Sequence, residues 1–252
     1  MKVLIIGAGN VATVLARLSQ KAGHQIIQVV SRSLSSAKVL ADELQCPYIN
    51  DFNLIDTGAD IYLVAMSDAA LNGLQENIRL KDQLIVHTAG AISKDILQSV
   101  STNFGVLYPL QSLRKEEKNE TLQIPVLIDG NNETSNKLLE TFAKTISPQV
   151  LFVCEEDRKK LHVAAVVVNN FNNYLFTLAS EYCSSEKVPF NLLYPLIDAL
   201  AGRLHQHNPA EMQTGPAFRK DTVTLEKHLR LLHSHQRLKS IYLKMSDSIM
   251  NG

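Results

Sequence analysis

The sequence predicts an α/β protein in which a doubly wound, mostly parallel sheet is followed by an all-α domain. In residues 1–154, short β-rich runs alternate with helical patterns, which is typical of parallel strands joined by crossover helices. After Cys154, the stretch EEDRKKLHVAAVVVNNFNNYLFTLASEYC contains neither Gly nor Pro and predicts one long buried helix. We therefore expect two domains, residues 1–154 and 155–252.

The first domain is expected to contain seven strands, each a short run of mainly aliphatic residues. The predicted strands are Lys2–Ile6, Gln25–Val30, Ile61–Met66, Gln83–His87, Gly105–Tyr108, Pro125–Ile128 and Gln149–Cys154. Between the first two, apolar residues recur at helical spacing and stop at Gly23, which predicts a helix. The polar stretch RKEEKNET, residues 114–121, is expected to be a loop.

Two further helices are expected in the second domain, Asn191–Leu204 and Thr222–Met250. The apolar residues of the latter are expected near one stripe: Leu225, Leu229, Leu232, Ile241, Met245 and Ile249. Together with Val163–Val168, this stripe exceeds the apolar surface that a domain of ~100 residues can bury alone. The sequence therefore predicts a homodimer through the C-terminal domain.

The composition is that of an ordinary globular protein, because 45% of the 252 residues are hydrophobic and 25 basic residues balance 25 acidic ones. No basic excess indicates binding to nucleic acid or to an anionic membrane. The apolar run Val3–Ile6 is too short for a signal peptide, and no run approaches the ~20 residues of a membrane span. We expect a cytoplasmic protein with neither nucleic-acid nor membrane partners.

Neither the cysteines nor the histidines predict a metal site. Cys46, Cys154 and Cys183 are far apart and form no CxxC pair, so we expect reduced cysteines that pack in the fold. Five of the eight histidines lie after Leu204, but no HExxH motif or cysteine partner accompanies them. No metal is therefore expected.

A glycine turn follows the first predicted strand and opens the first helix. Gly7, Gly9 and Ala12 fit G-x-G-x-x-A, in which the first glycine permits a tight turn and the second lets the backbone approach a pyrophosphate. This context predicts a Rossmann-type dinucleotide-binding domain, with Asn10 and Val11 among the residues that contact the cofactor with the two glycines. A tight turn without a ligand is the alternative.

The end of the second strand predicts which dinucleotide binds. NAD-specific domains carry an Asp or Glu there for the ribose hydroxyls, whereas this chain has Ser31, Arg32 and Ser33, and its nearest downstream acid is Asp42. A guanidinium with two hydroxyls suits a 2′-phosphate, so we expect NADP. Alternatively, Ser33 caps the next helix and Arg32 is a surface charge, although capping and phosphate binding can coexist.

Later strand ends are expected to surround the nicotinamide, since ligands lie beyond the carboxyl ends of strands in such sheets. The residues expected to contact the cofactor there are Met66, Ser67, Asp68, Thr88, Ala89 and Gly90. His87 is the first candidate for a proton donor, because it is a titratable group beside a small-residue turn. Tyr108 and Gln111 flank a proline bend, and Gln111 is expected to orient the substrate. Alternatively, Ser67 or Asp68 caps the next helix, His87 pairs with neighbouring carbonyls, and Tyr108 and Gln111 only pack in a loop.

A polar stripe is expected on the long helix of the second domain. His162, Asn169 and Asn173 are seven and four positions apart, which places them within ~40° of one another on an α-helix. His162 is the second candidate for the proton donor, and the asparagines are expected to orient the substrate. Alternatively, the amides bond across a helix or dimer interface. The segment QTGPAFRKD, residues 213–221, predicts either a simple helix start or an anion site.

Several of these motifs together resemble one family. GAGNVA, SRS, HTAGA, YPLQSL, VNNFNNYL and QTGPAFRKD resemble the signatures of bacterial Rossmann-like oxidoreductases whose C-terminal helical domain has no known function. The chain is more distantly similar to pyrroline-5-carboxylate reductase, deazaflavin-dependent NADP reductases and β-hydroxyacid dehydrogenases, including the C-terminal domain of 6-phosphogluconate dehydrogenase. The resemblance implies NADP in the N-terminal cleft, a substrate pocket between the domains and dimerisation.

One departure from these relatives limits what the resemblance implies. The β-hydroxyacid dehydrogenases carry a lysine four residues before an asparagine, but here Ala165 precedes Asn169, so we do not expect their acid chemistry. The expected function is NADPH-dependent reduction of a small carbonyl or imine compound by hydride transfer. The alternative is a non-catalytic NADP-binding or redox-sensing protein.

Overall fold

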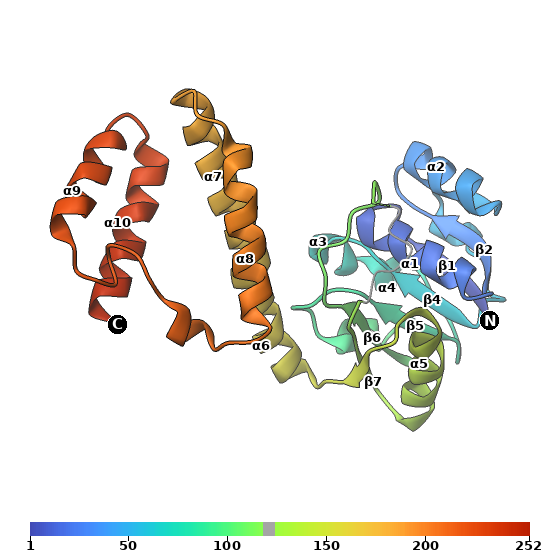
Figure 1. The fold of residues 1–252 in the computed structure, drawn as a ribbon. Helices are drawn as coiled ribbons and strands as arrows, with labels where there is room; N and C mark the ends of the chain where they lie inside the picture. The colour runs from blue at the N-terminus through green and yellow to red at the C-terminus, as the bar shows by residue number, and fades with distance from the viewer. Residues whose placement is uncertain (118–123) are drawn as a thin grey trace. The chain divides into compact units, whose positions relative to one another are not determined.

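The computed structural model describes residues 1–117 and 124–252, which form two compact units, Met1–Val167 and Val168–Gly252. Each unit is described by itself (Figure 1). The domain boundary expected after residue 154 precedes helix α6 (Glu155–Ala165), which belongs to the first unit. Of the predicted loop at residues 114–121, Arg114–Glu117 is irregular and exposed, and residues 118–121 lie outside the described part of the chain.

The first unit contains an eight-stranded sheet in the order β3-β2-β1-β4-β5-β6-β7-β8. Its strands are β1 (Lys2–Ile6), β2 (Gln25–Val30), β3 (Tyr48–Ile49), β4 (Ile61–Val64), β5 (Leu84–His87), β6 (Phe104–Pro109), β7 (Val126–Gly130) and β8 (Val150–Phe152). All neighbours pair in parallel except β6 and β7, which are antiparallel. The predicted α/β fold is confirmed, and the order reverses between β1 and β4, where such sheets bind ligands.

Helices cover both faces of this sheet because its strands are apolar on both sides, as buried parallel strands are. The helices of the first unit are α1 (Asn10–Lys21), α2 (Leu34–Leu44), α3 (Asp68–Leu71), α4 (Leu74–Asn77), α5 (Glu133–Ile146) and α6, of which α1–α5 contribute to the two cores. Val3 and Ile5 share a core with α1, α2 and α5, whereas Leu4 and Ile6 share the opposite core with α3, α4 and the 3₁₀ turn Lys94–Leu97. The two cores hold the carboxyl edge of the sheet in place.

The second unit is helical. Its helices are α7 (Asn172–Ser185), α8 (Tyr194–Leu204), α9 (Thr222–Leu231) and α10 (Gln236–Asn251), with 3₁₀ turns at Phe190–Leu193 and Pro209–Met212. Helices α9 and α10 are joined by a hydrogen bond of 2.7 Å between His228 Nδ1 and Tyr242 Oη. Arg237 of α10 pairs with Glu181 of α7 at 2.6 Å.

Two helix predictions were wrong in part. The helix expected after Cys154 is interrupted by a π-helical turn, Val166–Phe171, and many of its apolar side chains are exposed in the single chain. The single helix expected at Thr222–Met250 is two helices, separated near His235. Across residues 1–117 and 124–252, no helix is long and apolar enough to cross a membrane.

Candidate functional site

The glycine turn after β1 leaves room for a ligand in front of α1. Gly7 has a φ of +122°, and a Cβ atom there would collide with the carbonyl oxygen of Ala65. At Gly9, the N-cap of α1, a Cβ would meet no heavy atom of the described residues within 4 Å. No described side chain caps α1, and its first turn carries no acidic residue. These free backbone N–H groups and the open space fit a pyrophosphate.

The loop after β6 lies against the start of α1. The Oδ1 atom of Asn10 accepts a hydrogen bond from the Lys115 backbone N–H at 3.4 Å, and Arg17 donates to the Lys115 carbonyl at 2.6 Å. Asn10 is exposed and Val11 is half-buried. A cavity of about 400 Å³ lies beside the turn and is lined by residues of this loop, α1 and α2, including Ala8, Ser36 and Lys115.

The serine-rich segment after β2 forms the start of α2. Ser33 caps the helix by accepting a hydrogen bond from the Ser36 N–H at 3.3 Å, and its hydroxyl lies 3.1 Å and 2.9 Å from those of Ser35 and Ser36. Arg32 is exposed and Ser31 half-buried. The capping alternative therefore describes the free protein. Ser35 and Ser36, which were not predicted as site residues, add two hydroxyls to a group suited to an anion.

The ends of β4 and β5 supply the next residues of the edge. Met66 is half-buried, whereas Ser67 and Asp68 are exposed at the start of α3. Thr88 is buried, and its hydroxyl donates to the Val64 carbonyl at 3.4 Å. Ala89 packs in the core on the α3 side of the sheet. The carboxyl edge thus combines exposed polar groups after β4 with small buried residues after β5.

His87 is fully buried, and both of its ring nitrogens are used. Its Nε2–H donates to the Ser93 carbonyl at 3.1 Å, and its Nδ1 accepts from the Ala89 N–H at 3.2 Å. Burial lowers the pKa of His87 to about 4, so the ring is neutral at pH 7. This arrangement favours the carbonyl-pairing role over proton donation, because the only N–H of the ring is already engaged.

A second histidine lies at the same edge with a partner that the sequence analysis did not assign to it. His162 Nδ1 is 2.9 Å from the hydroxyl of Tyr108, the second-last residue of β6. Both residues are half-buried. Gly90 lies against this pair: a Cβ there would be 2.7 Å from His162 Nδ1 and 2.9 Å from Tyr108 Cζ. The absence of a side chain at position 90 therefore lets the tyrosine and histidine meet.

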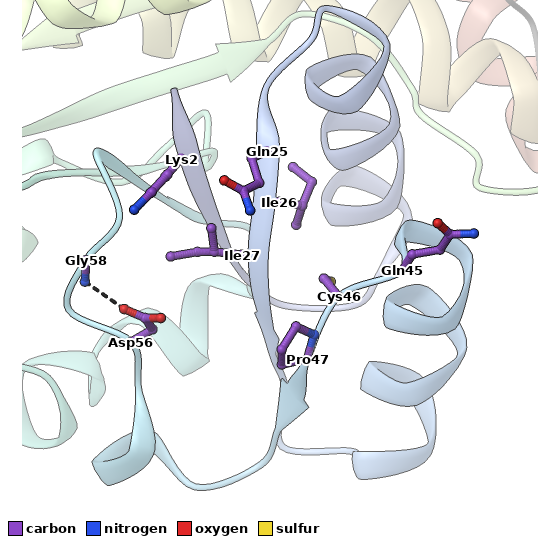
Figure 2. A pocket seen from close by; sticks show the side chains of 9 residues that line it. All are labelled: Lys2, Gln25, Ile26, Ile27, Gln45, Cys46, Pro47, Asp56 and Gly58. Carbon is purple, nitrogen blue, oxygen red and sulfur yellow. Dashed lines mark hydrogen bonds between the residues drawn. The ribbon is translucent and has the colours of Figure 1, made fainter.

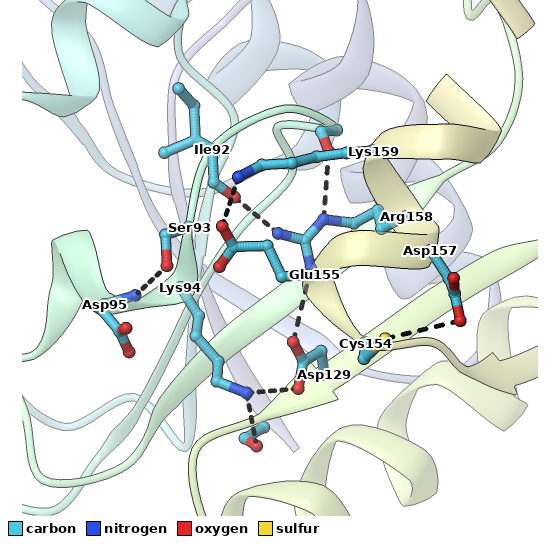
Figure 3. A network of polar contacts seen from close by, with 12 residues as sticks. Ile92, Ser93, Lys94, Asp95, Asp129, Cys154, Glu155, Asp157, Arg158 and Lys159 are labelled. Carbon is cyan, nitrogen blue, oxygen red and sulfur yellow. Dashed lines mark hydrogen bonds and ion pairs between the residues drawn. The ribbon is translucent and has the colours of Figure 1, made fainter. Parts of the chain in front are cut away.

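Arg158, one helical turn before His162, anchors α6 to the sheet (Figure 3). Its side chain is fully buried and donates to the carbonyls of Gly90 at 3.2 Å and Ile92 at 2.6 Å. Its Nη1 lies 3.5 Å from Asp129 Oδ2, and Lys94 binds the other oxygen of Asp129 at 2.5 Å. This network was not predicted from the sequence, in which the one available signal is that Arg158 and His162 share a helix face at i, i+4.

The predicted substrate-orienting residues are three exposed amides. Gln111 is exposed, and its side-chain oxygen accepts from the Ser112 N–H at 3.0 Å. Asn169 lies in the π turn and Asn173 in α7, both exposed and both in the second unit, whereas His162 belongs to the first. Since a π turn holds more residues than an α turn, the stripe expected from α-helical spacing is not regular.

A second cavity, of about 340 Å³, lies at the opposite edge of the sheet (Figure 2). Lys2 and Gln25, which begin β1 and β2, line it with Asp56 and the half-buried Cys46. Burial raises the pKa of the Cys46 thiol to about 11, so the thiol stays protonated and unreactive at neutral pH. The described residues contain no cluster of His, Cys, Asp or Glu that could hold a metal ion.

Two family models match the chain. Residues 2–90 match NADP oxidoreductase, coenzyme F420-dependent, and residues 124–249 match a domain of unknown function, DUF2520. A comparison with curated proteins finds no match.

Solved structures resemble the chain over its whole length. A protein of Bacteroides fragilis, assigned as an NADP oxidoreductase, is 35% identical, with a TM-score of 0.94 over 100% of this chain and 98% of its own. A pyrroline-5-carboxylate reductase of Streptococcus pyogenes is 16% identical (TM-score 0.64, 100% and 99% covered). An imine reductase of Myxococcus stipitatus is 14% identical (TM-score 0.64, 100% and 92% covered). These two reductases share the fold of this chain. The glycine turn, both family models and the 35% identity together show that this chain belongs to the NADP oxidoreductases that carry a DUF2520 domain.

Proposed function

We propose that the protein uses NADPH to reduce a small carbonyl or imine compound. The observation that carries the proposal is the half-buried Tyr108–His162 pair, which lies at the carboxyl edge of the sheet that also carries the glycine turn. Hydride transfer to a carbonyl or imine carbon also requires a proton on the oxygen or nitrogen, and a hydrogen-bonded phenol and imidazole can donate one. The fold shared with imine and pyrroline-5-carboxylate reductases supports a C=N or C=O substrate.

Residues of the first unit would hold the cofactor. The backbone at Gly7, Gly9, Asn10 and Val11 would receive the pyrophosphate, and Arg32 with the serines around it would receive the 2′-phosphate. The remaining predicted contacts would adjoin the nicotinamide: Met66, Ser67, Asp68, Thr88, Ala89 and Gly90. Bound NADPH supplies the hydride. The protein holds the ring, limits water and provides the proton.

Substrate orientation is assigned to amide side chains. Asn169, Asn173 and Gln111 are exposed and can donate and accept hydrogen bonds, which suits a small polar substrate. Replacing Asn169 or Asn173 with Leu should reduce turnover while leaving NADPH affinity nearly unchanged. If the Leu variants instead unfold early or change oligomeric state with normal turnover per folded site, the amides have a structural role.

The function is tested by NADPH oxidation at 340 nm against cyclic imines, aldehydes and keto acids, with calorimetric titration of NADPH in parallel. The proposal expects tight NADPH binding and turnover of at least one class of substrate. Tight binding without turnover of any class would instead favour the alternative of a non-catalytic NADP-binding or redox-sensing protein.

We also propose that the protein forms a homodimer through its second unit. Four leucines recur at every fourth residue around α8 and are exposed in the single chain: Leu192, Leu196, Leu200 and Leu204. Such a stripe favours burial against a second copy. Light scattering should show a dimer that Leu196→Glu dissociates and that Val39→Glu, a change at an exposed position on α2, leaves intact. A wild-type monomer at micromolar concentration would overturn this proposal. The cytoplasmic location stays a prediction.

A further inference from the structure

The Tyr108–His162 pair differs from an ordinary surface hydrogen bond in where it lies. Tyr108 is on β6, whose neighbour β5 ends at His87, and the residues that follow β5 pack directly under the pair at Gly90. The two rings pack edge to face, with centroids 5.8 Å apart and an interplanar angle of 70°. Two titratable side chains from distant parts of the sequence thus meet where only glycine allows it.

The pair is also accessible, in contrast to the other histidine of this edge. Tyr108 and His162 are both half-buried, whereas His87 is fully buried with both nitrogens used. A proton donor must come within hydrogen-bond distance of the reacting atom. Tyr108 is half-buried, so a substrate can reach its hydroxyl, whereas the fully buried His87 imidazole is closed to one.

We propose that Tyr108 donates the proton to the substrate and that His162 replaces it. This inference rests on the proposed reductase function and identifies its proton donor. As the nicotinamide hydride joins the carbon of the C=N or C=O group, the O–H bond of Tyr108 breaks and its proton joins the nitrogen or oxygen. The phenolate then takes the proton on Nδ1 of His162, while Nε2 of the same ring takes a proton from solvent, so that the imidazole passes one proton on and stays neutral. Tyr108 is the catalytic residue and His162 supplies its proton.

The charges around the pair suit this sequence of events. Burial raises the pKa of Tyr108, which keeps the phenol protonated until a substrate needs the proton. The guanidinium of Arg158 acts in the opposite direction and stabilises the phenolate that donation leaves. Arg158 is held in this position by Asp129 and by two backbone carbonyls.

The first test compares substrates that do and do not need a proton. At alkaline pH, neutral 1-pyrroline requires both a hydride and a proton, whereas its N-methylated cation becomes a neutral amine by hydride transfer alone. Tyr108→Phe should lower kcat for 1-pyrroline by about 100- to 10,000-fold, the usual contribution of general acid catalysis. The same variant should keep kcat for the N-methyl cation within about threefold of wild type, because the phenyl ring still packs on Gly90.

A matched control is available in the second unit. Tyr242 forms the same kind of pair with His228, with ring centroids 5.8 Å apart and an angle of 77°. Tyr242→Phe should leave kcat for both substrates unchanged. Equal losses on both substrates in Tyr108→Phe would mean that the hydroxyl is structural. No loss on either substrate would mean that another group donates the proton. Either result overturns this inference and leaves the proposed function standing. A wild-type enzyme inactive on both substrates overturns the proposed function and this inference with it.

The second test requires neither cofactor nor turnover. With 3-fluorotyrosine incorporated, the ¹⁹F signal of residue 108 should follow the titration of the His162 ring seen by ¹⁵N NMR. His162→Gln should abolish this pH dependence. A Tyr108 signal that titrates identically in His162→Gln would show that the two groups do not share a proton, which would overturn the relay.

Discussion

Arg158 Nη1 lies 3.5 Å from Asp129 Oδ2, and neither atom has a hydrogen-bond partner among the described residues. The two groups are therefore held together by charge, while the other nitrogens of Arg158 bind the carbonyls of Gly90 and Ile92. This places a buried cation between α6, which carries His162, and the segment after β5. The position of His162 depends on that cation.

Breaking this network should destabilise the first unit strongly. Arg158→Met removes the charge that faces Asp129 and the donor to the two carbonyls, so we expect a loss of about 3–5 kcal/mol in unfolding free energy. Arg158→Lys should lose less, because it keeps the charge. Urea unfolding measures both. Arg237→Met, which breaks an exposed pair with Glu181, is the control and should cost at most about 1 kcal/mol. Equal effects of Arg158→Met and Arg237→Met would contradict a structural role for the buried pair.

The two glycines of the turn should fail in different ways when replaced by alanine. Gly7→Ala should lower the melting temperature, since its φ of +122° is strained for alanine and its Cβ collides with Ala65. Gly9→Ala should melt like wild type but bind NADPH more weakly, because its Cβ fills the space in which we propose that the pyrophosphate binds. Calorimetry separates the two effects. Unchanged NADPH affinity in Gly9→Ala would show that the phosphates lie elsewhere.

His87 should make folding sensitive to acid. A buried imidazole whose pKa falls to about 4 in the native state binds a proton more readily when unfolded, where histidine titrates near ~6.5. The stability that His87 contributes is thus complete above pH ~6.5 and is lost as the pH falls to about 4. His87→Gln should have a flatter curve of stability against pH over this window, measured by urea unfolding. The exposed His207→Gln should keep the wild-type slope, and an equal slope in both variants would argue against a buried neutral His87.

Arg32 should determine the preference between the two dinucleotides. A hydrogen bond to a charged group contributes ~1.5–3 kcal/mol, so Arg32→Ala should weaken NADPH binding roughly ten- to a hundredfold and leave NADH nearly unchanged. Arg32→Asp should move the preference toward NADH, because it repels the 2′-phosphate and offers the ribose a carboxylate. Dissociation constants at one salt concentration test this. Arg219→Asp, the same charge change in the second unit, is the control, and equal weakening of both dinucleotides in Arg32→Asp would refute the assignment.

The strands of the sheet were the most predictable part of the fold. Lys2–Ile6 and Gln25–Val30 have the predicted bounds, because buried parallel strands are continuous apolar runs that end at glycines or polar residues. The strand Tyr48–Ile49 was not predicted, since two residues carry no periodicity and pair only through Val29 and Val30. Local patterns thus reveal long strands, whereas short ones depend on a neighbour.

The break between α9 and α10 could have been predicted from the spacing of the apolar residues in the sequence. At 100° per residue, Leu232 and Ile241 are about 180° apart on a continuous helix, so one helix could not have kept its apolar residues on one face. The buried position of Arg158 is a different case. It lies among the exposed charges of EEDRKK, and its burial follows from Asp129 and two carbonyls that are remote in sequence. The Tyr108–His162 contact joins residues 54 positions apart and could not be read from either motif alone.

Strand β1 lies in the interior of the finished sheet. Val3 of β1 pairs with Ile26 on one side and with Ile61 on the other, so a nascent chain that ends before β4 leaves one edge of β1 open. The Ala65 N–H donates to the Ile6 carbonyl at 2.8 Å, and the Ala65 carbonyl lies against Gly7. The glycine turn, where we propose that the pyrophosphate binds, is therefore completed only by Ala65, so the proposed cofactor site cannot form in a nascent chain that ends before β4.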